Sequence, residues 1–144
     1  MRALVNHVVG ANVRYEMTLA DAPLDDVEAT RAVDHLGQDA LASLRATAAA
    51  MVDAFASEGT LPRTFHHVIG DRTGRQLLVM RIYDIGVHTW DLAVAIGGDR
   101  RIDEDVVEVS LGATHAPDDE TDDVPAQERL LLRSGRHPRE GAHP

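Results

Sequence analysis

Three long stretches of the chain place apolar residues three or four positions apart, the spacing that gathers side chains on one face of an α-helix. They cover residues 2–19, about 38–57 and about 75–96, and we expect a helix in each. The third stretch differs from the others because it is apolar on nearly every side. A helix of that kind belongs in the interior of a bundle, so residues 75–96 are predicted to be a central helix.

Shorter elements are predicted between and after these stretches: a helical turn over residues 25–33, a loop or weak extended segment over 58–75, and short helices over about 104–113 and 125–134. Asp103 is a suitable N-cap for the first of these short helices. Pro125 and Gly135 mark the start and the end of the second. Helices without convincing strands predict an all-α bundle.

The length of 144 residues fits one domain. We expect a bundle over residues 1–114, an acidic linker with a short C-terminal helix over 115–136, and a disordered tail over 137–144. The acidic run 118–123 lacks the glycine and the final glutamate of an EF-hand calcium loop. It is therefore predicted to be a solvated linker.

The composition argues against several classes of function. A net charge of −10 disfavours non-specific binding to nucleic acid or to anionic membranes. The apolar run 76–96 contains Arg81, Asp84, His88 and Asp91, which would be costly in lipid, so it is not predicted to span a membrane. The N-terminal residues resemble no signal peptide, and we expect a cytoplasmic protein.

The usage of two residue types adds to this picture. All 14 basic residues are arginine, a bias that suggests a GC-rich bacterial genome. The chain has no cysteine, which excludes disulfides, thiolate ligands and a protein-borne thiol nucleophile. Any thiol chemistry would need a thiol supplied from outside.

Asp84 and His88 are the candidate metal ligands on the central helix. They are four residues apart, so they lie on one face, one turn above the other. A carboxylate and an imidazole on a buried helix cost free energy unless each finds a partner, and one divalent metal ion would serve both. The commoner explanation of such a pair is a simple hydrogen bond or ion pair.

His7 extends the pair to a set of three. It lies on the first predicted helix, between Leu4 and Val8, where an amphipathic helix would face its neighbours. Two histidines and one carboxylate leave coordination positions open for water or substrate, which is typical of catalytic metal sites. The alternative is a partly buried histidine bonded to a backbone carbonyl.

Three segments carry a resemblance to a known family: Leu4–Asn12 (LVNHVVGAN), Val87–Ala93 (VHTWDLA) and Pro125–Leu131 (PAQERLL). Together they resemble the mycothiol-dependent maleylpyruvate isomerase-like group of the DinB-like superfamily, and the similarity runs over most of residues 2–136. The resemblance implies a metal-binding four-helix bundle of the up-down-down-up type. It also implies a divalent metal, commonly zinc, bound by His7, Asp84 and His88.

The same resemblance implies an activity. It would be a thiol-dependent isomerase or transferase, with a small-molecule substrate and mycothiol or a similar small thiol as cosubstrate. A metal ion lowers the pKa of a thiol and so supplies thiolate near neutral pH. The alternative is a non-catalytic or degenerate metal-binding bundle that acts as a stress or interaction protein.

Two departures from the family pattern bear on these expectations. The family's acid is usually glutamate, and the carboxylate of Asp84 reaches roughly 1.5 Å less far, which predicts weaker metal binding. Related chains also carry another helix before the segment at which this sequence begins, so we expect either that the true start lies upstream of Met1 or that the bundle lacks its first helix. A bundle without that helix would expose an apolar groove and invite homodimerisation.

Further residues near the predicted site have open roles. Asp91 is expected either to orient His88 as a supporting carboxylate or to pair with a nearby arginine. Arg81 would compete for the carboxylate of Asp84 by forming an ion pair with it or would bind an anionic substrate. Trp90 is predicted to be core or pocket wall.

The other histidines are not predicted to bind metal. His66 and His67 are adjacent in a strand-like loop, so their side chains point opposite ways and at most one would reach a given ion. The four that stand in polar surroundings are expected to be exposed: His35, His115, His137 and His143.

Overall fold

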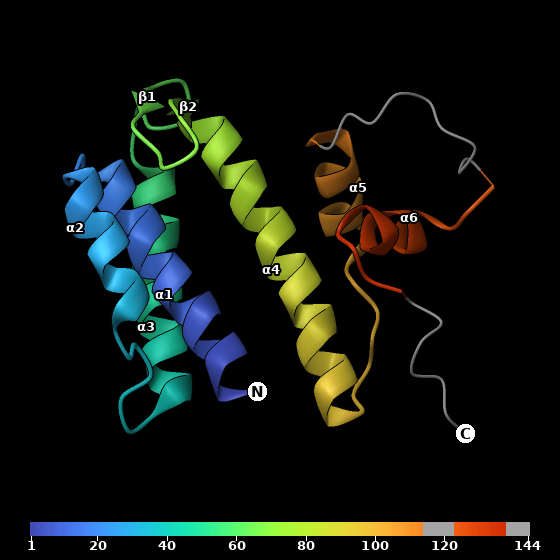
Figure 1. The fold of residues 1–144 in the computed structure, drawn as a ribbon. Coiled ribbons are helices and arrows are strands. Elements are labelled where there is room, and N and C mark those ends of the chain that lie inside the picture. Colours follow the sequence, from blue (N-terminus) through green and yellow to red (C-terminus); the bar gives the residue numbers. More distant parts are fainter. Residues whose placement is uncertain (114–122, 138–144) are drawn as a thin grey trace. The chain divides into compact units, whose positions relative to one another are not determined.

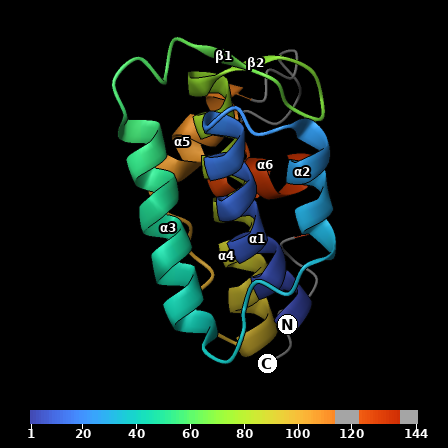
Figure 2. The same ribbon diagram turned by 90° about the vertical axis from the view of Figure 1, so that its left-hand side faces the viewer.

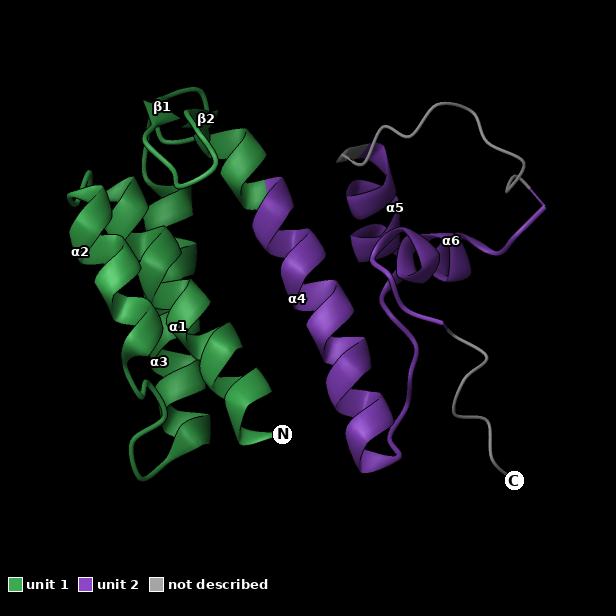
Figure 3. Cartoon of the chain, in the orientation of Figure 1, with its two compact units in different colours: residues 1–78 green, residues 79–144 purple. Residues whose placement is uncertain are grey.

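The structure is a computed structural model, which describes residues 1–113 and 123–137. The acidic run of the predicted linker (118–122) and most of the predicted tail (138–144) lie outside the described residues. The chain divides into two compact units, Met1–Leu78 and Val79–Pro144 (Figure 3), and the boundary between them falls inside one long helix.

The part of the chain that the structure describes is mostly helical, with six α-helices, one 3₁₀ turn and a two-stranded sheet (Figure 1). The elements in order are α1 (Arg2–Leu19), α2 (Leu24–Ala29), the 3₁₀ turn η1 (Thr30–Ala32), α3 (Ala40–Ala56), β1 (Thr64–Phe65), β2 (Arg72–Thr73), α4 (Gly74–Ile96), α5 (Glu104–Ala113) and α6 (Ala126–Arg133). The all-α class is therefore confirmed, and so are the helices expected from the spacing of apolar residues.

The first unit is built on α1, which lies between α2 and α3 (Figures 1 and 2). One buried polar contact joins α1 to α3: the side-chain amide of Asn12 donates to the hydroxyl of Thr47 at 3.1 Å. Asn12 is only 2% exposed, so this bond supplies the partner that a buried amide requires. The buried hydrophobic residues of these two helices include Val9, Met51 and Phe55.

Side chains cap the helices that follow. Asp39 accepts a hydrogen bond from the backbone of Ala42 at 2.9 Å and begins α3. Thr73 and Gln76 begin α4 with reciprocal bonds, in which each side chain accepts from the other residue's backbone N–H, at 3.2 and 2.9 Å. This is a capping box, and it fixes the start of α4 directly after β2.

The second unit has a core to which α4, α5 and α6 all contribute. Val87 and Trp90 of α4 pack with Ile102, Val107, Leu130 and Leu131, all at most 8% exposed. The prediction that Trp90 belongs to the core or a pocket wall is confirmed. Asp103 caps α5, as predicted, by accepting from the backbone of Asp105 at 3.0 Å.

The apolar surface of α4 is not buried on every side, contrary to the sequence-based expectation. Ile85 is 36% exposed and Ile96 is 60% exposed. Gly86 shows how closely α5 approaches one face, because a Cβ there would lie 2.7 Å from Cγ1 of Val106. Among the described residues, no helix is both long and apolar enough to cross a membrane.

Candidate functional site

Asp84 and His88 lie one turn apart on α4, in the second unit, and their side chains meet. Oδ1 of Asp84 is 3.3 Å from Nε2 of His88, and both side chains are mostly buried. Two ligands that each lie about 2.1 Å from one ion, at a tetrahedral angle, are about 3.4 Å apart. The separation of the two atoms therefore suits a shared metal ion as well as a direct ion pair.

Arg81 holds the other oxygen of this carboxylate. Its guanidinium contacts Oδ2 of Asp84. The side chain of Arg81 is 1% exposed, so the ion pair stands in a poorly hydrated environment, where it fixes the orientation of the carboxylate. The ion pair expected from the sequence is confirmed, and it uses Oδ2 while Oδ1 faces His88.

Asp91 contacts the opposite side of the His88 ring. Oδ2 of Asp91 is 2.9 Å from Nδ1 of His88. The same carboxylate accepts two hydrogen bonds from Arg136, from Nε at 3.1 Å and from an Nη atom at 2.7 Å. The two alternatives for Asp91 thus occur together, because it orients His88 and pairs with an arginine.

These contacts shift the protonation of both partners. The hydrogen bond with Asp84 raises the pKa of His88, and Asp91 adds to this effect while burial opposes it. Burial pushes the pKa of Asp91 upward, but the hydrogen bonds from Arg136 and His88 outweigh it and lower the pKa. A protonated His88 can therefore donate to a carboxylate from each ring nitrogen.

The way in which α6 ends determines the position of Arg136. Gly135 has a left-handed backbone, with φ of 76°, and its N–H donates to the carbonyl of Leu132 at 3.0 Å. The N–H of Arg136 donates to the carbonyl of Leu131 at 2.8 Å. These two bonds form a Schellman motif, which turns the chain at Gly135, as predicted from that glycine, and directs Arg136 to Asp91.

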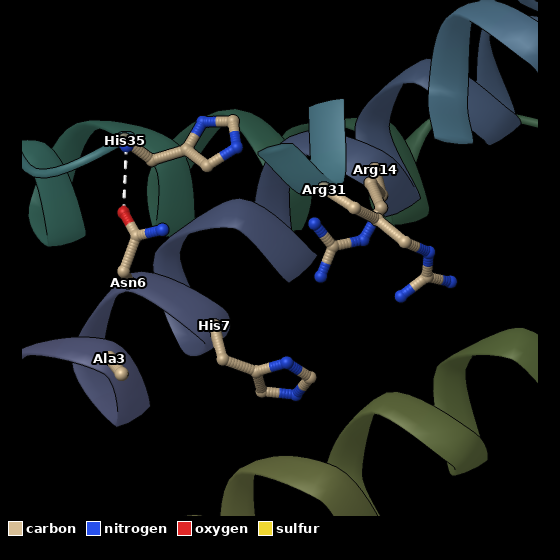
Figure 4. A pocket seen from close by; sticks show the side chains of 6 residues that line it. All are labelled: Ala3, Asn6, His7, Arg14, Arg31 and His35. Atoms are coloured by element: carbon tan, nitrogen blue, oxygen red, sulfur yellow. Dashed lines mark hydrogen bonds between the residues drawn. The ribbon is translucent and has the colours of Figure 1, made fainter. Parts of the chain in front are cut away.

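His7, the third predicted ligand, belongs to the first unit. It is exposed on α1 and lines a hollow of about 350 Å³ with Ala3, Asn6, Arg14, Arg31 and His35 (Figure 4). The structure therefore brings Asp84, His88 and Asp91 together within one unit and places His7 in the other. The participation of His7 in a common site stays a prediction.

The prediction for His35 is wrong. It is half-buried, and its ring lies against α1 at Gly10, where a Cβ would be 2.6 Å from Cδ2 of the ring. The ring atom Nε2 is 2.9 Å from the carbonyl of Thr30, and since a carbonyl only accepts, Nε2 donates. The sequence signal for this contact is Gly10 of the HVVG segment, because a residue without a side chain allows another side chain to approach the helix closely.

The structure describes three of the remaining five histidines. His137 is exposed, as predicted, whereas His115 and His143 lie outside the described residues. Nδ1 of His66 is paired with Asp71 in the loop between β1 and β2. Burial lowers the pKa of His67, whose ring lies near that of Tyr15.

Comparisons with known proteins identify two relatives. They are Uncharacterized protein MT0763 of Mycobacterium tuberculosis (strain CDC 1551 / Oshkosh) and Uncharacterized protein Rv0738 of Mycobacterium tuberculosis (strain ATCC 25618 / H37Rv). Each is 30% identical to the chain over 113 residues, which is 78% of this chain and 58% of the relative. The chain thus spans less than two thirds of the length of these relatives. No family model and no solved structure matches it.

Proposed function

We propose that the chain binds one divalent metal ion through His7, Asp84 and His88, and that Asp91 orients His88. The observation that carries the proposal is the environment of the His88 ring. Nε2 stands 3.3 Å from a carboxylate oxygen, and Nδ1 stands 2.9 Å from a second carboxylate. Metal-bound histidines in proteins commonly donate their other ring N–H to a carboxylate in this way, which fixes the tautomer.

The donor set is the basis for naming the ion. Two imidazole nitrogens and one carboxylate oxygen are ligands that zinc accepts, and three protein ligands leave a position open. A bound divalent ion would lower the pKa of a small thiol that coordinated to it. Because the chain has no cysteine, that thiol would be a small molecule such as mycothiol. The proposed activity is a thiol-dependent isomerase or transferase on a DinB-like bundle.

Three residues of the second unit would have different roles at this metal centre. Asp84 would bind through Oδ1, since Arg81 holds its other oxygen. Asp91 would keep the proton on Nδ1 of His88 and so leave Nε2 available for the ion. Arg136 would hold Asp91 in place through its two hydrogen bonds.

One observation favours a second candidate function, a non-catalytic bundle. The same contacts satisfy a protonated His88 without any ion, because each ring nitrogen faces a carboxylate and each carboxylate also contacts an arginine. In that case the row of charged side chains is a structural ion-pair network. The chain would then act as a stress or interaction protein.

Metal content tests the metal site, which is the first step of the proposal. The purified chain would be analysed by mass spectrometry for stoichiometric metal, then stripped with a chelator and titrated with zinc against a competing chelator. We expect about one equivalent in the wild type and loss of tight binding in His7→Ala and His88→Ala. His137→Ala removes an exposed histidine outside the set and should bind as the wild type does.

Asp91→Asn tests the orienting role. Loss of a supporting carboxylate typically weakens metal affinity about 10–100-fold, so an intermediate affinity is expected. A wild-type chain that binds no stoichiometric metal, or a His88→Ala variant that binds as tightly as wild type, contradicts the metal site. If metal binds, turnover of an electrophile with added thiol decides the activity. Turnover that disappears on chelation supports the enzyme, and its absence supports the non-catalytic bundle.

A further inference from the structure

The hollow beside His7 in the first unit has a positive lining on a strongly acidic chain. Its volume is about 350 Å³, and Arg14 and Arg31 are its two cationic side chains (Figure 4). None of the six lining residues carries a carboxylate, although the whole chain has a net charge of −10. A concave, positively lined site of this kind concentrates anions.

The two guanidinium groups come from different elements. Arg14 belongs to α1, and Arg31 belongs to η1. Nε of Arg31 donates to Glu28 at 2.6 Å, which offsets part of its charge. A guanidinium has five N–H donors in a planar fork, so this contact leaves Arg31 able to donate to a ligand as well.

The wall of the hollow is held in place by hydrogen bonds. The side-chain amide of Asn6 donates to the carbonyl of Val33 at 3.0 Å and accepts from the backbone of His35 at 2.7 Å. The ring of His35 donates to the carbonyl of Thr30 at 2.9 Å. These bonds tie the segment that follows η1 to α1, so the cationic groups line a preformed cavity, which reduces the ordering cost of binding.

We propose that this hollow binds a small organic anion, whose carboxylate or phosphate oxygens accept hydrogen bonds from Arg14 and Arg31. Planar guanidinium groups suit both acceptors because they bind two oxygens side by side. The volume is at the lower end for ligand pockets, which fits a small molecule and not a polymer. The site needs no metal ion and goes beyond the proposed metal centre, with which it shares only His7.

Calorimetry on the full chain, stripped of metal by a chelator, tests the inference. Succinate and inorganic phosphate are titrated separately, so that the two arms distinguish a carboxylate ligand from a phosphate ligand. We expect saturable one-to-one binding of at least one of them. Arg14→Gln and Arg31→Gln should each weaken binding about tenfold or more, the usual effect of losing a charge-assisted hydrogen bond.

Two further variants separate a defined site from diffuse charge. Arg45→Gln removes an equal charge from an exposed position on α3, outside the hollow, and should leave the affinity unchanged. Ala3→Leu keeps every charge and fills part of the hollow from an exposed position on α1, so it should weaken binding even if an arginine variant fails to fold.

Three results would overturn the inference: no saturable binding of either anion, equal weakening by Arg14→Gln, Arg31→Gln and Arg45→Gln, or undiminished binding by Ala3→Leu. Failure of the metal centre would be recognised independently, from the metal content. Anion binding that persists in the stripped chain supports this site whatever that content is.

Discussion

Gly86→Ala should destabilise the second unit, although alanine is the better helix former. A Cβ at this position would lie 2.7 Å from Cγ1 of Val106, where carbon atoms in ordinary contact are about 3.5–4.0 Å apart. Val106 is β-branched and has one strongly preferred rotamer in a helix, so it cannot turn aside. The neighbouring Val107 is buried in the shared core, which resists a shift of α5.

The two opposing effects have known magnitudes. Replacing glycine by alanine inside a helix gains about 1 kcal/mol, whereas forcing extra atoms into a packed interface costs about 1–3 kcal/mol. We therefore expect the free energy of unfolding to fall by up to about 2 kcal/mol. Val106→Ala removes the obstructing methyl groups, so the double variant should recover at least about 1 kcal/mol relative to the sum of the single variants.

Urea titration of the metal-free chain measures these differences. Trp90 is the single tryptophan and lies in the core of this unit, so its fluorescence reports the unfolding of the unit. Gly112→Ala is the matched control, because among the described residues no atom beyond its chain neighbours and the nearby backbone of its own helix lies within 4 Å of a Cβ at that position. It should stabilise the chain by up to about 1 kcal/mol. Equal stabilisation by Gly86→Ala and Gly112→Ala would refute the close approach of α5.

Three other predictions concern a helix end, a helix start and a titrating group. Gly135→Ala places a Cβ on a backbone with φ of 76°, so the chain should lose about 1–2 kcal/mol of stability in urea titration. Asp39→Ala removes the N-cap of α3 and should cost about 1 kcal/mol in thermal unfolding, whereas Asp53→Ala, at an exposed position of the same helix, should change little. Hydrogen bonding with Asp84 raises the pKa of His88 above its unfolded value of about 6.5. In the metal-free chain this contribution is therefore complete below that pH and is lost as the pH rises through the folded-state pKa. The free energy of unfolding should fall with pH across this range in the wild type and change less in His88→Gln.

The long helices could be predicted from the sequence because their signals are local. Repeated apolar spacing located α1, α3 and α4, and Asp103 and Gly135 marked the ends of two short helices correctly. The capping box of α4 is a signal of the same local kind, because Thr73 and Gln76 stand at the separation that such a box requires. Such signals act over a few residues, where chain geometry leaves little freedom.

Only those residues of the candidate site that are close together in sequence could be predicted to meet. Asp84, His88 and Asp91 lie within a span of eight residues on one helix, so helical geometry alone brings them together. Arg136 is 45 residues from Asp91 in sequence, and its place depends on how α6 packs and ends. No spacing rule reports such a contact.

The error at His35 has a similar origin. Polar neighbours in the sequence indicated an exposed side chain, but exposure depends on what the folded chain places nearby. Gly10, 25 positions earlier, has no Cβ, and this allows the ring of His35 to lie against α1. The hollow that contains Arg14 and Arg31 was missed for the same reason, because its residues come from separate elements that meet only in the fold.

The arginine and aspartate side chains around His88 balance one another in charge. Arg81 and Arg136 carry two positive charges and Asp84 and Asp91 carry two negative charges, so His88 adds a charge only when it is protonated. A metal site made of clustered carboxylates repels itself when it is empty, whereas these side chains do not. The second unit can therefore keep its shape without a bound ion. The ion of the proposed centre would then bring an excess of two positive charges, which would attract a negatively charged substrate.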